Sequence, residues 1–374
     1  MKKYILLLVA MFPSLNALAQ FGVSADTITL GQSAAFSGPA KDLGVEMRDG
    51  ALLAFNEFNR QGGAHGRKIK LISYDDGYEP DRAVANTKKL INDDKVFALF
   101  GAVGTPTSKA VLPIFTEAKV PYFGAFSGAE LLRSPFNRYI FNVRASYYDE
   151  TERIVEHLIS LGRDKIGVLY QNDAYGQAGL AGVERALRKR KLEIAVKATI
   201  ERNSSEVSAA VKQMNAAGPQ AVVMIGAYDG IAAFVKAMKQ SGSNTEFHNV
   251  SFVGSISLAK ALGADGAGVA ISQVVPSPFD QTVPIVKEYQ RLMKAAGGAG
   301  YSFTSLEGYI AARVFIEGLK RAGKNLSREG FIDALEGMWN VNLDGFHIAF
   351  SPQNHQASTF VDMTMIARDG RFVR

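Results

Sequence analysis

Strands and helices alternate along most of this chain, and that alternation limits the fold more than any other feature. Short apolar runs at 27–34, 68–74 and 96–102 are each followed by a segment with apolar residues at helical spacing, such as 43–61. Parallel strands need a crossover between them, usually a helix, so this order predicts parallel sheets covered by helices. We therefore expect an α/β fold.

The alternation occurs in two runs, which predicts two lobes. The first run ends with a strand expected at 139–143, and the second includes strands expected at 250–253 and 272–275. A chain of 374 residues has room for two lobes of roughly 150–200 residues each. The remaining predicted elements are helices at 284–296, 305–322 and 328–337 and strands at 343–350 and 360–367.

We expect the three late helices to pack on the first lobe and the final strand to join the second. Each lobe then holds a doubly wound parallel sheet, and three hinge crossovers near 143–146, 275–279 and 352–358 join the two. The predicted limits are 20–143 plus 279–352 for lobe 1 and 144–278 plus 353–374 for lobe 2.

The N-terminal segment 1–19 has the pattern of a secretory signal peptide. Lys2 and Lys3 precede an apolar run of about nine residues, and Ala17-Leu18-Ala19 supplies small residues at the spacing of a cleavage site. A membrane anchor is the alternative, but a span needs ~20 apolar residues. We expect cleavage after Ala19 and export to the periplasm.

The composition argues against most kinds of chemistry. The chain has no cysteine, which excludes disulfides, thiolate metal sites and cysteine nucleophiles, and its five histidines lack ligand spacing. No phosphate-binding loop, dinucleotide fingerprint or HExxH motif is present. We expect neither enzyme activity nor a cofactor or metal. Basic and acidic residues are mixed at a net charge of +6, so we expect no nucleic-acid partner, and we interpret the basic run 185–191 as a solvated face.

Two polar turns are the strongest functional signal. Gly104-Thr105-Pro106 follows one apolar strand, with Thr105 expected as the N-cap of a helix, and Ala125-Phe126-Ser127-Gly128 follows the next strand. The carboxyl ends of parallel strands form the ligand-binding edge of such sheets, and helix N-termini bind anions. Each turn could simply be a capped loop; together they predict a surface that recognises an anion in the interlobe cleft.

The sequence resembles the leucine/isoleucine/valine-binding family of periplasmic binding proteins, which have the type 1 ligand-binding fold. The resemblance covers essentially the whole mature chain and is carried by four segments, at 37–39, 55–63, 72–76 and 172–176. It implies a monomer that catches a solute between its lobes through a hinge motion and delivers it to an ABC-type permease.

The resemblance also implies a set of ligand contacts. The family's carboxylate-binding hydroxyls fall on Thr105 and Ser127, with a backbone contribution at Ala125, and its cleft tyrosines fall on Tyr175 and Tyr228. A first-lobe aromatic residue falls on Leu43, so that contact is lost. The predicted ligand-binding residues are Thr105, Ala125, Phe126, Ser127, Tyr147, Tyr175, Tyr228 and Ile256.

Departures from the family pattern bear on the ligand. Amino-acid binders place an acidic residue where this chain has 254–257, and a second one near Tyr147, yet neither position holds a carboxylate here. A buried ammonium without such a partner loses a charge-assisted hydrogen bond of ~1.5–3 kcal/mol. We therefore predict a small carboxylate with an apolar or aromatic body as ligand. An amino acid stays possible if Asp229 or Asp149 substitutes, and a domain that presents solute to a membrane receptor is the alternative of another class.

The resemblance gives the missing cysteines a location. Family members often carry a disulfide between the turn after the second strand and the ligand-binding turn, and these positions fall on Tyr78 and Gly104. Both partners are replaced, so the chain must stabilise this turn by packing.

Overall fold

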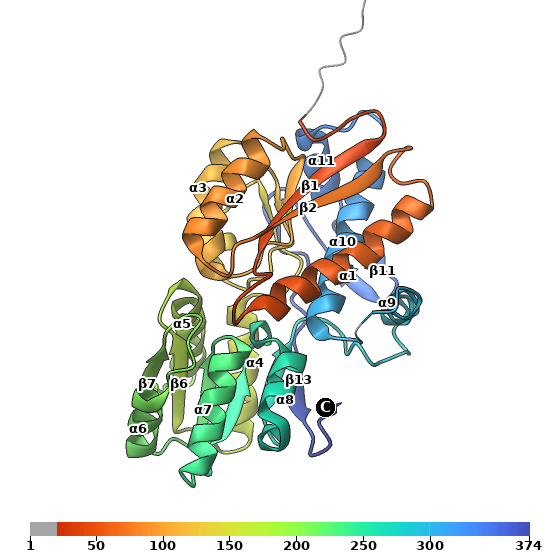
Figure 1. Cartoon of the computed structure of the whole chain (residues 1–374). Helices are drawn as coiled ribbons and strands as arrows, with labels where there is room; N and C mark the ends of the chain where they lie inside the picture. The colour runs from red at the N-terminus through yellow and green to blue at the C-terminus, as the bar shows by residue number, and fades with distance from the viewer. Residues whose placement is uncertain (1–20, 299) are drawn as a thin grey trace, which may run out of the picture.

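Two large sheets, one in each of two lobes, form the body of the molecule, and the lobes lie one above the other in Figure 1. The computed structural model describes residues 21–298 and 300–374; the predicted signal peptide, 1–19, lies outside this range. Figure 1 shows the N-terminal strands in one lobe and the middle of the chain in the other. The α/β fold predicted from the alternation is confirmed. The residue limits of the two lobes stay a prediction.

The first sheet, within the described residues, has five parallel strands in the order β2-β1-β3-β4-β5. They are β1 (Thr27–Ala34), β2 (Lys68–Asp75), β3 (Ala98–Phe100), β4 (Tyr122–Phe123) and β5 (Ile140–Phe141). In the sheet β1 lies between β2 and β3, so the strand order reverses direction beside β1. A crevice opens at such a point, at the carboxyl ends of the strands.

Helices cover both sides of this sheet (Figure 1). They are α1 (Lys41–Arg60), α2 (Pro80–Asn92), α3 (Thr105–Glu117), η1 (Glu130–Leu132), α9 (Pro284–Ala295), α10 (Phe303–Ala322) and α11 (Arg328–Glu336). The helices α1 and α10 pack so closely that a Cβ built on Gly50 would lie 1.8 Å from the Ser305 carbonyl oxygen. Glycine at that crossing is therefore a steric requirement of the packing.

The second sheet has seven strands in the order β14-β13-β10-β9-β8-β6-β7 over the same described range. They are β6 (Ile166–Gln171), β7 (Val196–Ile200), β8 (Ala221–Ile225), β9 (Glu246–Asn249), β10 (Ala270–Gln273), β13 (Asp362–Ile366) and β14 (Phe372–Val373). The other elements of this part of the chain are α4 (Tyr147–Ser160), α5 (Ala174–Arg188), α6 (Ser208–Ala217), α7 (Tyr228–Gln240), η2 (Ser251–Val253), α8 (Ser255–Leu262) and η3 (Gly263–Gly266).

Three sequence predictions about strands were wrong. The segment 250–253 was expected to be a strand, but it contains the short 3₁₀ helix η2, whose apolar side chains are buried beside the cleft. The strand of this region is the preceding, more polar β9. The segment 343–350 is a hairpin of β11 (Val341–Leu343) and β12 (Phe346–Ile348), turned by Asp344-Gly345 with positive φ angles. The second sheet is mixed, since β13 and β14 join it antiparallel.

The turn before α3 is shaped by a tyrosine that packs on a glycine. Gly104 has a φ of 102°, and a Cβ built on it would lie 2.2 Å from the ring of Tyr78. The Tyr78 side chain is fully buried. The two positions to which the sequence resemblance assigns the family's disulfide are thus in direct contact here, where the Tyr78 ring packs on the backbone of Gly104.

We expect Gly104→Ala to destabilise the protein for two reasons, backbone strain and overlap with Tyr78. Gly62 provides the matched control, because its φ is 105° and nothing lies within 4 Å of a Cβ placed there. Chemical denaturation should give a loss of about 1–2 kcal/mol for Gly62→Ala, and about 1–3 kcal/mol more for Gly104→Ala. Equal losses in the two variants would show that the Tyr78 contact contributes nothing.

Candidate ligand-binding site

Four of the predicted site residues stand at the beginnings of helices. Thr105 is the first residue of α3, Tyr147 of α4 and Tyr228 of α7, and Tyr175 is the second residue of α5. The N-terminus of a helix carries a partial positive charge and free N–H groups. Helices from both lobes therefore begin beside the cleft, a pattern that suits an anionic ligand.

The two predicted hydroxyls lie together. The Oγ atoms of Thr105 and Ser127 are 2.8 Å apart, and both side chains are fully buried. Thr105 is not the N-cap, which corrects the sequence prediction. Gly104 takes that position, because its positive φ suits glycine, and so the Thr105 hydroxyl bonds to Ser127 instead of capping its own helix. Ala125 is buried beside them, and its carbonyl accepts the Ser127 N–H.

Aromatic rings from both lobes fill the space between these helix starts. The ring of Phe252, in η2, lies 5.2 Å from Phe126 and 4.5 Å from Tyr175, centroid to centroid. Tyr147 and Tyr175 lie 5.4 Å apart, and Tyr78 lies 5.9 Å from Phe252. Sequence reasoning missed Phe252 and gave Tyr78 no part in the cleft. We call these five rings the aromatic cluster.

The aromatic cluster contains two hydroxyls that lack partners. The hydroxyl groups of Tyr147 and Tyr175 are buried and have no hydrogen-bond partner among the described residues. Burial raises the pKa of Tyr147 to about 12 and that of Tyr175 well above its usual value, so both are neutral O–H donors. An unsatisfied buried donor costs free energy unless a bound molecule accepts from it.

A buried arginine, which sequence reasoning also missed, lies beside the aromatic cluster. The Arg144 guanidinium carbon is 4.8 Å from the centre of the Phe126 ring and 5.9 Å from that of Tyr147. Its Nε and one terminal nitrogen make no hydrogen bond within the described chain. The available signal was a single charged residue in an otherwise uncharged crossover, Asn142 to Ala145.

Acidic residues from both lobes surround Arg144. Its other terminal nitrogen bonds Glu150 at 3.3 Å and the Ser251 hydroxyl, and its Nε lies 3.6 Å from a carboxylate oxygen of Glu307 in α10. Glu150 also accepts from the Ser272 hydroxyl at 2.6 Å. Burial raises the pKa of Glu307 to about 7, although Arg144 opposes that rise. We call these residues the hinge network.

Polar contacts close the seam between the lobes at two places. On one side Arg202 pairs with Glu79 at 2.8 Å, and Asn203 donates to the Gly77 carbonyl at 3.1 Å. On the other side the Tyr228 hydroxyl accepts the Asp42 N–H at 3.4 Å. The Ser257 hydroxyl donates to the Asp42 carboxylate there at 2.7 Å. The two lobes therefore contact each other at both places, and the structure is a closed arrangement.

Ile256 lies apart from the other seven predicted site residues. It lines a hollow between α1, α8 and α10 that none of the other seven predicted residues borders. The remaining seven lie at or beside the cleft.

The two carboxylates that could hold an ammonium differ in availability. The Asp149 carboxylate accepts from the backbone N–H and the hydroxyl of Ser146 in a capping box, and from Gln356. Asp229 at the start of α7 is half-buried, and burial together with the nearby charge of Asp42 raises its pKa. Asp229 is therefore the better candidate.

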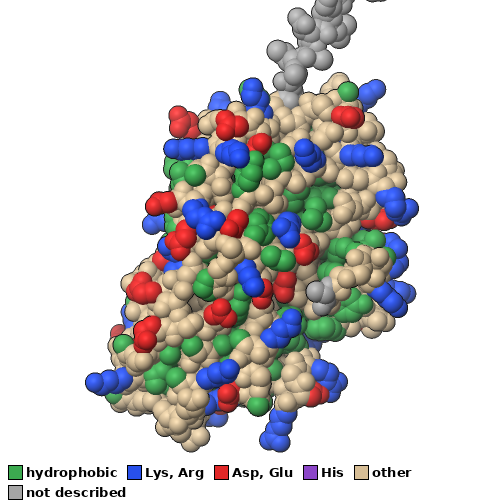
Figure 2. All heavy atoms as spheres, in the orientation of Figure 1, with side chains coloured by type: hydrophobic (Ala, Val, Ile, Leu, Met, Phe, Trp, Pro, Cys, Tyr) green, Lys and Arg blue, Asp and Glu red, His purple; other side chains and the backbone are tan. Residues whose placement is uncertain are grey.

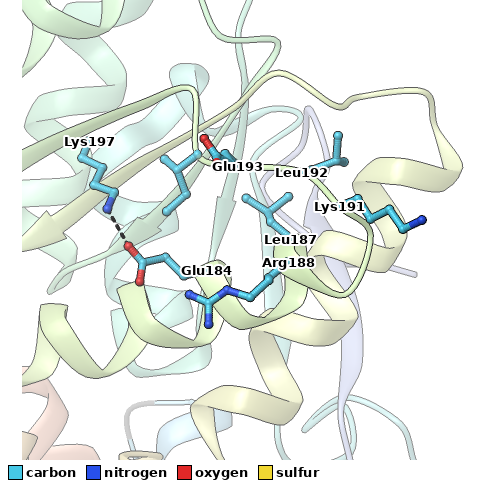
Figure 3. Close-up of a pocket in the computed structure, with 8 residues that line it drawn as sticks. Glu184, Leu187, Arg188, Lys191, Leu192, Glu193 and Lys197 are labelled. Carbon is cyan, nitrogen blue, oxygen red and sulfur yellow. Dashed lines mark hydrogen bonds and ion pairs between the residues drawn. The ribbon is translucent and has the colours of Figure 1, made fainter.

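A further hollow lies on the outer surface of α5, away from the cleft (Figure 3). It has a volume of about 420 Å³, and an ion pair of 2.5 Å between Lys197 and Glu184 spans it. Two residues of the basic run, Lys189 and Arg190, pair with Glu152. This surface is thus a partly neutralised, solvated face.

Other chemistry finds little support in the described residues. No group of three or more His, Asp or Glu side chains between residues 21 and 374 is arranged to hold a metal ion, the masked position apart. Asp75 accepts the N–H groups of Phe36 and Ser37, and Asp76 accepts that of Tyr78, so the pair Asp75-Asp76 shapes turns. Among the helices that the structure describes, none is long and apolar enough to cross a membrane.

Two α/β lobes that close over buried hydrogen-bond donors define a solute-binding protein. The family model described as a periplasmic binding protein matches residues 27–371, and the chain belongs to that family. Its fold and relatives are those of the leucine/isoleucine/valine-binding proteins, as the sequence resemblance indicated. Members of the family bind substrates and are not enzymes.

Relatives agree over most of the chain. A leucine-, isoleucine-, valine-, threonine- and alanine-binding protein of Pseudomonas aeruginosa is 25% identical over 83% of each chain. A Leu/Ile/Val-binding protein homolog of Brucella abortus is 26% identical over 94% of this chain and 91% of its own. The crystal structure of a possible leucine/isoleucine/valine-binding protein from Rhodopirellula baltica has a TM-score of 0.89 and 34% identity over 94% of this chain and 97% of its own.

We expect Arg144→Met to destabilise the protein by about 3–5 kcal/mol, because it leaves Glu150 and Glu307 buried without their cation. Arg163→Met is the matched control, since Arg163 forms a partly exposed pair with Glu246 and should cost about 0–1 kcal/mol. Urea denaturation of both variants measures the difference. A loss of under 1 kcal/mol for Arg144→Met would contradict the role assigned to the hinge network.

The raised pKa of Glu307 predicts a loss of stability with rising pH. The pKa is higher in the folded chain than in the unfolded one, so its stabilising contribution is complete below about pH 4.5 and is lost as pH rises through about 7. Glu307→Gln should reduce the difference in unfolding free energy between pH 5 and pH 8 by about 1 kcal/mol or more. The control is Glu317→Gln on the same helix, where an unchanged difference is expected. Identical pH profiles for wild type and Glu307→Gln would refute the assignment.

Proposed function

We propose that this protein is the substrate-binding component of an ABC-type importer and that it binds a small carboxylate with an apolar or aromatic body. It acts in the periplasm as a monomer, after cleavage behind Ala19. The ligand lies between the lobes, and its carboxylate meets the hydroxyls of Thr105 and Ser127. The aromatic cluster packs around its body.

The observation that carries the proposal is that the buried groups without hydrogen-bond partners in and beside the aromatic cluster are donors. The hydroxyls of Tyr147 and Tyr175 and one terminal nitrogen of Arg144 are hydrogen-bond donors, and none of the three has an acceptor in the described chain. A ligand that satisfies them must supply oxygen acceptors, and a carboxylate supplies about four lone-pair sites. Hydrogen bonds from charged or well-oriented donors to a carboxylate are the stronger kind.

The acidic groups around the cleft argue against an ammonium. Glu150 and Glu307 face Arg144, and Asp173 caps α5 by accepting the Tyr175 N–H at 2.9 Å. Each of these carboxylates therefore has a cation or donor already. A ligand ammonium in the aromatic cluster would compete with Arg144 and carry its own desolvation cost.

A branched-chain or other amino acid is the second candidate, favoured by one specific observation. Asp229 and Asp42 approach each other across the seam closely enough for Asp42 to raise the pKa of Asp229. An ammonium placed between them would relieve that repulsion. The names of the relatives from Pseudomonas aeruginosa and Brucella abortus point the same way. A ligand-sensing role towards a membrane receptor is the candidate of another class, and an adjacent operon without permease genes would favour it.

A matched pair of ligands separates the two chemistries. We expect 4-methyl-2-oxopentanoate or phenylpyruvate to raise the melting temperature, whereas leucine and phenylalanine, which carry an ammonium in place of the keto oxygen, should not. Saturation at 100 times Kd stabilises by about 2.7 kcal/mol. If only the amino acids stabilise the protein, the carboxylate proposal fails, and loss of their effect in Asp229→Asn would establish the second candidate.

Removing the unpartnered hydroxyls should weaken the ligand without weakening the fold. For Tyr175→Phe and Tyr147→Phe we expect unchanged or higher melting temperatures, but affinity for the bound carboxylate reduced by about 1.5–3 kcal/mol each, measured by calorimetry. Thr105→Ala should reduce affinity as well.

The matched control for these variants is Tyr289→Phe. The Tyr289 hydroxyl accepts the Ser302 N–H at 3.1 Å, so its loss should lower stability and leave affinity unchanged. Full affinity in both Tyr147→Phe and Tyr175→Phe would place the ligand elsewhere.

A further inference from the structure

A second hollow opens on the seam between the lobes, on another face of α1. It has a volume of about 390 Å³, within the range of small-molecule pockets. The residues that we use to define this seam hollow are Glu46, Asp49, Leu52, Leu53, Ile256, Lys260, Met293 and Tyr301. Figure 2 shows hydrophobic side chains gathered on this side of the molecule, below α1, amid mixed charges.

The seam hollow occupies its own stripe of α1. Residues 46, 49, 53 and 56 recur at the three- and four-residue spacing that places them on one face of a helix. Leu43 and Met47 lie on a different face and are fully buried, with Met47 in contact with Gly101 at the end of β3. The helix therefore separates the seam hollow from the interior of the first lobe.

The seam hollow is lined by aliphatic side chains and by one carboxylate that a hydrogen bond holds in place, that of Glu46. Leu52, Leu53 and Ile256 are only partly buried although they are aliphatic. The Glu46 carboxylate accepts from the Ser302 hydroxyl at 2.7 Å, which holds it in place, and its side chain is also partly exposed to the hollow. Lys260, by contrast, is exposed, and its ammonium makes no hydrogen bond or ion pair within the described chain. The fixed charge that a ligand meets is therefore negative.

We propose that the seam hollow binds a small amine with an apolar tail, its ammonium paired with Glu46 and its tail packed on Leu52, Leu53 and Ile256. Ile256 and Lys260 lie in α8, between two strands of the second sheet, whereas the other lining residues belong to α1, α9 and the segment leading into α10. A ligand there contacts both lobes and favours the closed arrangement.

The electrostatics of the seam hollow fit this ligand. Burial raises the pKa of Glu46 to about 7, and Asp42 adds to the rise. The titratable groups that face Glu46 or line the hollow beside it are Asp42 and Asp49 on α1, Tyr228 on α7, Lys260 on α8, Tyr289 on α9 and Tyr301 in the segment before α10. An ammonium stays charged at pH 6–8, so its binding should tighten by about tenfold from pH 6 to pH 8 as Glu46 ionises.

The probe is hexylamine, compared with hexanoate, on the full mature chain. Because the natural chain has no cysteine, a fluorophore on Asn56→Cys at the rim of the seam hollow reports occupancy specifically. We expect saturable binding of hexylamine, no binding of hexanoate at this label, and at least tenfold weaker amine binding in Glu46→Gln. Glu57→Gln on the same helix is the matched control and should keep its affinity within threefold, since Glu57 lies outside the seam hollow and pairs with Arg60 at 2.6 Å.

The outcomes separate this proposal from the cleft. Equal amine affinity in wild type and Glu46→Gln, or equal binding of hexanoate and hexylamine, would overturn it. Amine binding that Tyr175→Phe abolishes and Glu46→Gln spares would assign the amine to the interlobe cleft, and would also overturn it. Failure of the carboxylate screen with an intact Glu46-dependent amine signal would count against the proposed cleft ligand alone.

Discussion

The position of one buried cation, the Arg144 guanidinium, fixes how the two lobes meet. A charge of this kind inside a protein is tolerated only where carboxylates and hydroxyls surround it. Its partners come from both sides of the crossover: Glu307 from α10 and Glu150 from α4. The arrangement of the lobes seen here completes this network. The same arrangement brings Phe252 of the second lobe against Phe126 and Tyr78 of the first, so the geometry of the candidate site depends on the hinge network.

The topology of the sheets explains why the cleft is rich in donors. Each parallel strand ends at the same edge, and the helix that follows begins there with its N–H groups free. Two lobes that face each other with these edges place the starts of α3, α4, α5 and α7 around one space. An acceptor-rich ligand complements that space without any acidic or basic residue at its centre. Arg144 adds a guanidinium beside it whose charge is matched by Glu150 and Glu307, but whose terminal nitrogen without a hydrogen bond still offers a charged donor.

Much of the fold could be predicted from the sequence, because the alternation of strands and helices is local. The hydroxyl pair was predictable for the same reason, since Thr105 and Ser127 each follow an apolar strand. The N-cap was not, because glycine at position 104 is required by the Tyr78 ring from another segment. Arg144 and Phe252 were missed because most of their partners are distant in the chain: Ser251 lies 107 residues from Arg144, and the Phe126 ring beside Phe252 belongs to the other lobe. The apolar turn 251–253 looks like a strand for the same reason: its hydrophobicity serves the interlobe contact and not a sheet.

The α1 helix separates two environments of opposite character. Its buried face, with Leu43 and Met47, lies towards the carboxyl ends of the first sheet. The hydrogen-bond donors without partners, on Tyr147, Tyr175 and Arg144, belong to this interior side. Its outer stripe presents a carboxylate and aliphatic side chains to the seam. A molecule that carries both an acid and an amine fits neither environment without leaving one charge unpaired, whereas an acid fits the first and an amine the second. On the two proposals above, this electrostatic division along one helix is the physical reason that we expect the chain to prefer an acid in the cleft to an amino acid.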